Sequence, residues 1–170
     1  LAGYYAKKMG LPVGKLICAS NSNNVLTEFF VSGDYDANRE FFKTMSPSMD
    51  ILVSSNLERL LFEVSGRNAE LTASRMAELK KYGKYSVNKE ELASLKKEFY
   101  ADCADEEECL EEINEFFDEY GYVLDPHTAV AAAVYNKYKE ETGDTTKTVI
   151  ASTASPYKFT RTVLSAMDEK

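Results

Sequence analysis

Two neighbouring hydroxyl residues, Ser152 and Thr153, are the first candidates for binding chemistry. They follow the β-branched run Thr148–Ala151, which is typical of a short buried strand. Ser155 and Pro156 then predict a helix start, with serine as the cap and proline at the first helical position. Ligands of open α/β sheets bind at the carboxyl ends of the strands. The pattern therefore predicts that Ser152 and Thr153 face a bound small molecule.

Two further polar loops are candidates for the same ligand edge. The loop 21–24 follows the predicted buried strand Lys15–Ser20, whereas the loop 46–50 does not clearly follow a strand. In a parallel sheet the carboxyl ends of the strands lie along one edge, so these loops could converge with Ser152 and Thr153. Capping and turn formation explain the asparagines nearly as well. The candidate residues are Asn21, Asn23, Asn24, Ser46, Ser48 and Asp50.

The single histidine, His127, lies in the first turn of a helix that Asp125 and Pro126 are expected to start. The helix dipole disfavours the imidazolium at that place and keeps the ring neutral. Both a catalytic role and a structural hydrogen-bonding role are open for this histidine. No serine has the context of a nucleophile elbow, and the chain contains no glycine-rich phosphate loop. These residues alone indicate an α/β domain with a ligand edge, without naming a reaction.

Composition and charge exclude several classes of partner. The 170 residues are enough for one domain, and 44% of them are hydrophobic. The net charge of −8 argues against a nucleic-acid partner or an anionic membrane surface. No apolar run approaches the roughly 20 residues of a membrane span. We therefore expect no nucleic-acid and no membrane partner.

The cysteine content and the first residues indicate a compartment and a longer parent protein. Three cysteines and one histidine match no zinc spacing, so we expect no metal site. An odd, sparse cysteine count is typical of a reducing cytoplasm. The first ten residues lack the features of a signal peptide, and the first residue is leucine and not an initiator methionine. We therefore expect a cytoplasmic chain that begins inside a longer protein.

The order of the predicted elements is helix, strand, helix, helical block, strand, helix, strand, helix. This order predicts an α/β fold in which helices flank a parallel sheet. Helices are expected at about 69–82, 89–100 and 106–119, so that residues 68–120 form a helical insertion.

A capping box joins a small polar residue to a glutamate three positions later. The predicted boxes pair Ser55 with Glu58, Asn88 with Glu91, and Asp105 with Glu108.

Four stretches resemble threonine synthase in the order in which that family carries them. They are AGYYAKKMGLPVGKLICASNSNNVLTEFF, SPSMDILVSSNLERLLFE, LDPHTAVAAAVYNKY and STASPYKFTRTV. The resemblance runs over essentially all 170 residues and is loosest between residues 69 and 120. Many relatives carry histidine in the last motif, at the position of Ser155, so no role of that histidine is transferred.

The resemblance implies a pyridoxal-phosphate enzyme with the tryptophan-synthase-β-like fold, a three-layer parallel sheet of fold type II. It implies O-phospho-L-homoserine as substrate and L-threonine and phosphate as products, in threonine biosynthesis. Thr153, with Ser152 beside it, matches the family's threonine whose hydroxyl faces the pyridine nitrogen of pyridoxal 5'-phosphate. The SPSMD motif is expected near the active-site cleft.

The resemblance also implies that the chain is the carboxyl-terminal part of the catalytic region. The family's Schiff-base lysine is expected in an amino-terminal part that lies upstream of Leu1. By itself the chain is therefore expected to be inactive, and to cover exposed apolar surface by self-association.

Two alternatives stay open at this point. One is a sibling enzyme of fold type II, such as a threonine dehydratase or a cysteine synthase. The other is a threonine-synthase-like protein without catalysis that binds a ligand or a partner.

Overall fold

A computed structural model describes residues 1–167. The described chain divides into two compact units instead of the single core that its length predicts. Unit 1 contains residues 1–18, 25–41 and 51–101, and unit 2 contains residues 19–24, 42–50 and, of the described residues, 102–167. Strands β1 (Leu16–Ser20) and β4 (Phe99–Cys103) pair as a short parallel sheet. A sheet of two strands is too narrow to organise all the helices around one core.

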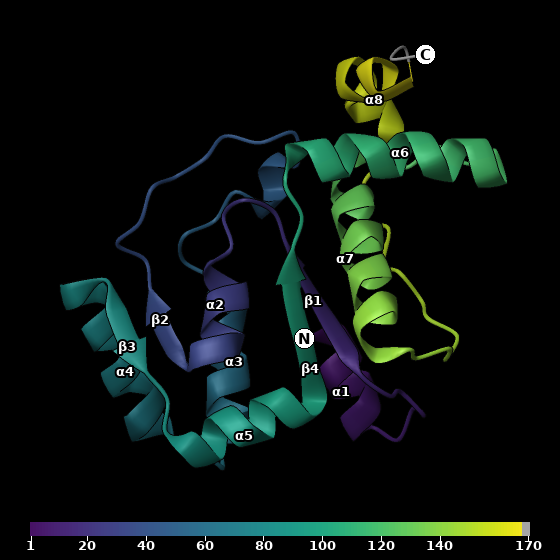
Figure 1. The fold of residues 1–170 in the computed structure, drawn as a ribbon. Coiled ribbons are helices and arrows are strands. Elements are labelled where there is room, and N and C mark those ends of the chain that lie inside the picture. Colours follow the sequence, from purple (N-terminus) through teal and green to yellow (C-terminus); the bar gives the residue numbers. More distant parts are fainter. Residues whose placement is uncertain (168–170) are drawn as a thin grey trace. The chain divides into compact units, whose positions relative to one another are not determined.

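Unit 1 is built from helices around an aromatic core (Figure 1). The core contains Phe29, Tyr35 and Tyr85, and the rings of the two tyrosines stack at 5.1 Å. Large apolar side chains recur at helical spacing, which is why these segments form amphipathic helices. Besides residues 16–18 of β1 and 99–101 of β4, this unit contains α1 (Ala2–Lys8), α2 (Val25–Ser32), β2 (Asp34–Asp36), α3 (Ser55–Val64), α4 (Ala69–Tyr82), β3 (Lys84–Ser86) and α5 (Lys89–Glu98).

The block predicted to be wholly helical contains two strands. Strand β3 pairs antiparallel with β2, with Tyr35 opposite Tyr85. The helix predicted at 89–100 ends at Glu98, where β4 begins. A strand of three to five residues has too little periodicity to stand out beside a helix, and pairing decides its conformation. The boxes Asn88–Glu91 and Asp105–Glu108 are confirmed.

Unit 2 is built around helix α7 (Pro126–Thr142), whose buried residues include Val130 and Val134. Asp125 caps this helix and Gly143 ends it in a left-handed conformation, as the sequence predicts. Helix α6 lies between α7 and α8 in Figure 1, and both neighbours contact it. The remaining elements of the unit are η1 (Pro47–Met49), α6 (Glu106–Tyr120), η2 (Pro156–Lys158) and α8 (Thr160–Met167).

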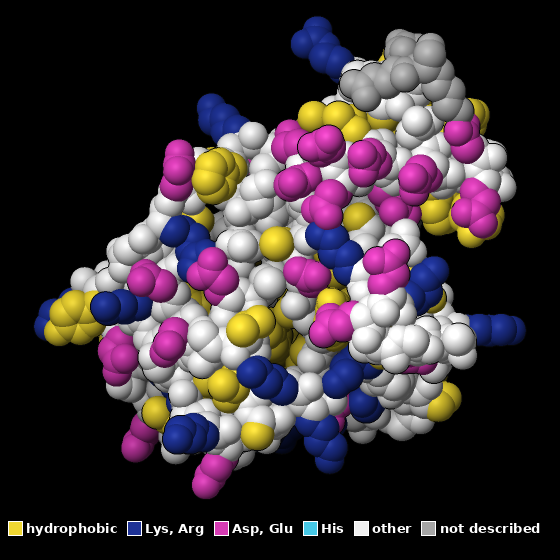
Figure 2. Space-filling model, viewed as in Figure 1, with side chains coloured by type: hydrophobic (Ala, Val, Ile, Leu, Met, Phe, Trp, Pro, Cys, Tyr) yellow, Lys and Arg dark blue, Asp and Glu magenta, His cyan; other side chains and the backbone are white. Residues whose placement is uncertain are grey.

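The acidic run at the start of α6 behaves mainly as a solvated helix face. Figure 2 shows acidic side chains gathered over this helix. Glu112 is the exception, because it is buried and accepts a hydrogen bond from Asn136 Nδ2 at 2.9 Å. Burial raises the pKa of the Glu112 carboxyl. Within residues 1–167, no helix has both the length and the apolar content needed to cross a membrane.

Three local predictions are wrong. Residues 148–151 form no strand, since no described strand pairs with them and a strand needs a partner for its backbone hydrogen bonds. Ser155 makes no side-chain cap; a short 3₁₀ turn, η2, precedes the helix instead. Ser55 is the first residue of α3 rather than its cap, and Ser54, which is the cap, makes no side-chain cap bond, so no capping box forms there.

Candidate functional site

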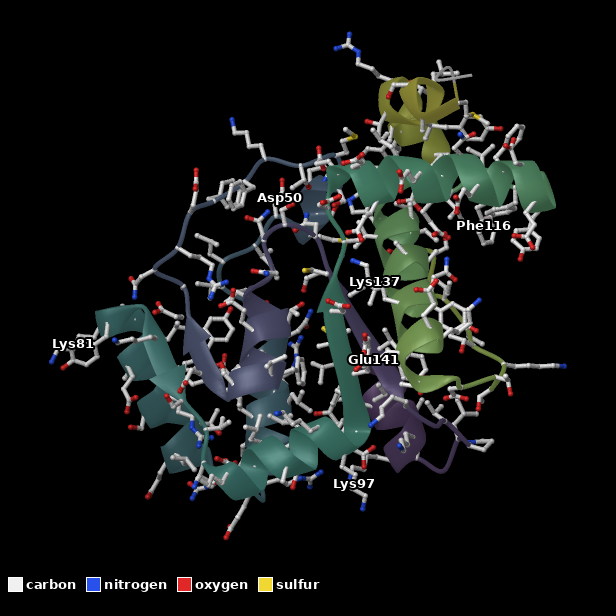
Figure 3. All side chains as sticks on the ribbon, in the orientation of Figure 1. Asp50, Lys81, Lys97, Phe116, Lys137 and Glu141 are labelled. Atoms are coloured by element: carbon white, nitrogen blue, oxygen red, sulfur yellow. The ribbon has the colours of Figure 1, made fainter. Side chains whose placement is uncertain are left out.

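Two of the predicted loops meet at the carboxylate of Asp50. Asn21 Nδ2 donates to Asp50 Oδ1 at 2.8 Å, and Asn23 Nδ2 donates to the same oxygen at 3.1 Å. Thr44 adds its hydroxyl at 2.6 Å and its backbone N–H at 3.0 Å. Both asparagines are buried. The loops 21–24 and 46–50 therefore meet at Asp50, which is labelled in Figure 3.

Hydrogen bonding decides the charge state of Asp50. Burial opposes ionisation, but the bonds from Thr44, Asn21 and Asn23 outweigh it and lower the pKa of the carboxyl. An ionised carboxylate can only accept, so all of these donors point toward it. The result is a rigid anchor under both loops.

His127 joins the SPSMD turn to the start of α7. Its Nε2 accepts a hydrogen bond from the backbone N–H of Ser48 at 3.2 Å. Its Nδ1 lies 2.9 Å from Asp125 Oδ1. The ring also meets Phe159 edge-on, with the ring centroids 4.9 Å apart. The structural role that was open for this histidine is thus present in the fold.

Asp125 is the centre of a second polar cluster and is 1% exposed. It accepts hydrogen bonds from the backbone N–H groups of His127 and Thr128, at 2.9 and 3.4 Å. The Thr128 hydroxyl lies 2.5 Å from Asp125 Oδ2 and 3.0 Å from Ser152 Oγ. Burial opposes the charge on Asp125, but the bonds from Thr128 and His127 outweigh it and lower the pKa of the carboxyl. The third predicted loop is anchored through this cluster.

Ser152 and Thr153 differ in their surroundings although they are adjacent. Ser152 is held by Thr128, whereas no hydrogen bond joins the Thr153 side chain to another residue among 1–167. Both residues are exposed. The turn therefore has one anchored hydroxyl and one hydroxyl that is available to a ligand.

Asn24 points to a different neighbour than the other two asparagines. Its Nδ2 lies 3.9 Å from Cys103 Sγ. The carbonyl of Cys103 accepts a hydrogen bond from Lys137 Nζ at 2.8 Å, and Lys137 also pairs with Glu108 at 2.5 Å (Figure 3). Burial disfavours the ammonium charge, but Glu108 outweighs it and raises the pKa of Lys137. Asn24 thus borders a charged group at the carboxyl end of β4.

Two residues that hold the site together were not predicted. Neither Thr44 nor Thr128 belongs to a sequence motif that indicates a role for its hydroxyl. The signal that could have indicated Thr128 is its place three residues after the cap Asp125, where a side chain faces back to the cap. Among the described residues, no group of histidine, cysteine and acidic side chains is arranged to hold a metal ion.

The Thr153 turn offers a hydrogen-bond donor that a neutral aromatic ring nitrogen of a ligand can accept. The exposed Thr153 hydroxyl can donate to a pyridine nitrogen, and its neighbour is already anchored. The donor set available here therefore agrees with the ring of a pyridine cofactor.

Comparison with known proteins gives matches to threonine synthases. A family model described as "Threonine synthase, C-terminal" matches residues 128–170, which include most of α7 and the Thr153 turn. Threonine synthase of Saccharomyces cerevisiae is 37% identical over 98% of this chain. The crystal structure of the yeast enzyme superposes with a TM-score of 0.93 over 99% of this chain, at 36% identity.

Over almost its whole length, the chain is similar to the threonine synthases. A threonine synthase from Brucella melitensis, solved with pyridoxal phosphate bound, matches 97% of this chain with a TM-score of 0.90 and 40% identity. Human threonine synthase-like 1 is 41% identical over the whole chain. The α/β fold predicted from the sequence is confirmed by these structures.

The threonine synthase relatives are longer than this chain. It spans 35% of the yeast threonine synthase and 23% of human threonine synthase-like 1. It spans 35% of the Brucella melitensis chain.

Proposed function

We propose that this chain forms the carboxyl-terminal part of a threonine synthase. The whole enzyme converts O-phospho-L-homoserine and water to L-threonine and phosphate in threonine biosynthesis, in the cytoplasm. The observation that carries the proposal is the Thr153 turn, which matches the family motif and presents an exposed hydroxyl beside an anchored one. The three free thiols support a reducing compartment.

Pyridoxal 5'-phosphate is the cofactor of this proposal. When bound, it supplies the electron sink for negative charge that develops on the substrate. Thr153 donates its hydroxyl to the pyridine nitrogen, and Ser152 lines the same turn. A neutral donor does not force the ring to be protonated. The Schiff-base lysine belongs to a part of the longer protein outside these 170 residues, because no lysine here stands in the family's motif.

The polar loops form the substrate edge of the proposed site. Asn21, Asn23 and Ser46 are buried and hold the loops in place around Asp50. Asn24 and Ser48 are more exposed and lie closer to solvent. We assign contact with substrate to these two residues and support of the loops to the others.

Removing the Thr153 hydroxyl tests the cofactor site. Thr153→Val keeps the shape of the side chain and removes its donor, so the longer protein should bind pyridoxal phosphate about 10-fold more weakly. Absorbance titration of the apoprotein with the cofactor measures this. Thr148→Val removes another exposed hydroxyl of the same segment and should leave the affinity unchanged. Equal affinity of the Thr153→Val protein and the parent would disprove the proposed role.

The isolated 170-residue chain should form no threonine from O-phospho-L-homoserine and should self-associate. Val149 and Tyr157 are 94% and 87% exposed, and exposed apolar side chains favour association. Light scattering and a phosphate-release assay on the isolated chain measure both properties. Threonine formation by the isolated chain would contradict the first expectation, and a monomer that shows little dye-accessible apolar surface would contradict the second.

A threonine-synthase-like protein without catalysis is the second candidate. The chain is 41% identical to human threonine synthase-like 1 and 37% identical to the yeast threonine synthase, so both candidates are kept. Threonine formation by the longer protein separates the two. If the longer protein instead consumes threonine, it is a dehydratase of the same fold. If it consumes O-acetylserine, it is a cysteine synthase of that fold.

A further inference from the structure

The position of each hydrogen in the chain of contacts around Asp125 follows from elementary rules. Thr128 has one hydroxyl hydrogen and two oxygen neighbours, Asp125 Oδ2 and Ser152 Oγ. Asp125 is ionised and can only accept, so Thr128 donates to Asp125. Thr128 is also on the donor side of the 3.0 Å contact with Ser152 Oγ, so one hydroxyl lies within hydrogen-bond distance of both Asp125 and Ser152.

The same rule sets the tautomer of His127. Its Nε2 faces the backbone N–H of Ser48, which can only donate, so Nε2 carries a lone pair. Its Nδ1 faces Asp125 Oδ1, which can only accept, so Nδ1 carries the hydrogen. The side chain is 11% exposed, and both nitrogens are in use. A protonated Nε2 would place two donors against each other at Ser48.

We propose that His127 is a positioning residue, which as the neutral Nδ1–H tautomer links the Ser48 turn through Asp125 to the Ser152 turn. His127 donates to Asp125 from the Ser48 turn, and Thr128, which also contacts Ser152, donates to it from the other side. Asp125 therefore fixes both turns to the start of α7. Ser152 is thereby held by Thr128, and Thr153 is the hydroxyl of this turn that remains to donate to a ligand. The inference rests on the proposed cofactor site for the role of Thr153, but the tautomer is independent of it.

Nitrogen NMR of ¹⁵N-histidine-labelled protein tests the tautomer directly. His127 is the single histidine of these 170 residues, so its signals in this chain need no further assignment. At neutral pH we expect Nδ1 to resonate as a protonated nitrogen and Nε2 as an unprotonated one. A protonated Nε2, an imidazolium or an average of two tautomers would overturn the inference.

Variants of His127 test whether this residue positions the two turns. The readout is the difference in cofactor affinity between two folded variants, which a general loss of stability would not produce. In His127→Asn the amide lies where Nδ1 lay and can still donate to Asp125, whereas His127→Gln places its amide near Ser48. We expect His127→Asn to bind pyridoxal phosphate within about 3-fold of the parent and His127→Ala about 10-fold more weakly. Equal losses in folded His127→Asn and His127→Ala proteins would contradict the link through Asp125.

Comparison of the two hydroxyls separates this inference from the proposed function. Ser152→Ala should weaken cofactor binding by less than about 3-fold, against about 10-fold for Thr153→Val. If Ser152→Ala costs as much as Thr153→Val, the distinction between a held Ser152 and a ligand-facing Thr153 is wrong although the cofactor site stands. If neither change weakens binding while NMR shows the Nδ1–H tautomer, the cofactor site is wrong and the tautomer stands.

Discussion

Replacement of Asp125 by alanine should lower the free energy of unfolding by about 4 kcal/mol. The change removes the cap of α7, worth about 1 kcal/mol, and leaves buried donors without an acceptor at about 1–3 kcal/mol each. These donors are the Thr128 hydroxyl and the ring and backbone N–H groups of His127. Urea unfolding followed by far-UV circular dichroism measures the loss, and hydrogen exchange should show it in α7.

Asp105→Ala is the matched control, because Asp105 also caps a helix but is exposed. Its loss should be about 1 kcal/mol. Equal effects of the two substitutions would show that burial of Asp125 adds nothing to its role as a cap.

Acid should reduce the difference between the Asp125→Ala protein and the parent. The pKa of Asp125 is lowered in the folded chain. A carboxyl with a lowered pKa stabilises the fold above its unfolded value of 3.8 and loses this contribution as the pH falls through the folded value. The stability gap between the two proteins should therefore narrow below about pH 4. A gap that is constant down to pH 2 would contradict this linkage.

Replacement of Glu91 by alanine should cost a similar amount, about 3–5 kcal/mol, in unit 1. Arg75 of α4 binds the Glu91 carboxylate through two nitrogens, at 2.9 and 2.5 Å, and both side chains are 6% exposed. Glu91 also accepts the backbone N–H of Asn88 in the capping box of α5. Its removal leaves the guanidinium buried without a countercharge. Hydrogen exchange should rise in α4 and α5, and urea unfolding gives the magnitude.

The neighbouring glutamate offers a control for the Glu91 prediction. Glu90→Ala removes an exposed acidic residue from the same first turn and should cost less than about 1 kcal/mol. The double replacement Arg75→Met with Glu91→Met removes both charges and should recover much of the loss. A Glu91→Ala protein as stable as Glu90→Ala would contradict the importance of the buried pair. The Arg75 guanidinium lowers the pKa of Glu91, so acid should weaken this pair as well.

Helix termini were predictable from the sequence where a side chain bonds its own backbone. The bounds of α4, Ala69–Tyr82, agree with the predicted 69–82, and the cap Asp125 and the stop Gly143 agree as well. Caps and left-handed glycines act within one turn of the chain, so local sequence determines them. Ser54 and Ser55 show the limit of this rule, because two adjacent serines leave the first helical residue ambiguous.

Short strands were not predictable in the same way. Residues 148–151 carry a strand-like sequence and form no strand, whereas β2 and β3 were not expected and pair with each other. A strand obtains its hydrogen bonds from residues that are distant in the chain. Its formation therefore depends on whether a partner is present, which the residues of the strand do not encode.

For the candidate site too, the sequence indicated the residues, and the tertiary structure decided how they are connected. The sequence by itself determined the candidates: the hydroxyls at 152 and 153, the asparagine loop, the SPSMD turn and a histidine at a helix start. The tertiary structure decided their connections, with Asp50 under two loops and Asp125 between His127 and the Ser152 turn. The physical reason is that residue types carry the capacity to donate or accept, whereas the direction of each hydrogen bond depends on which groups the fold brings within about 3 Å.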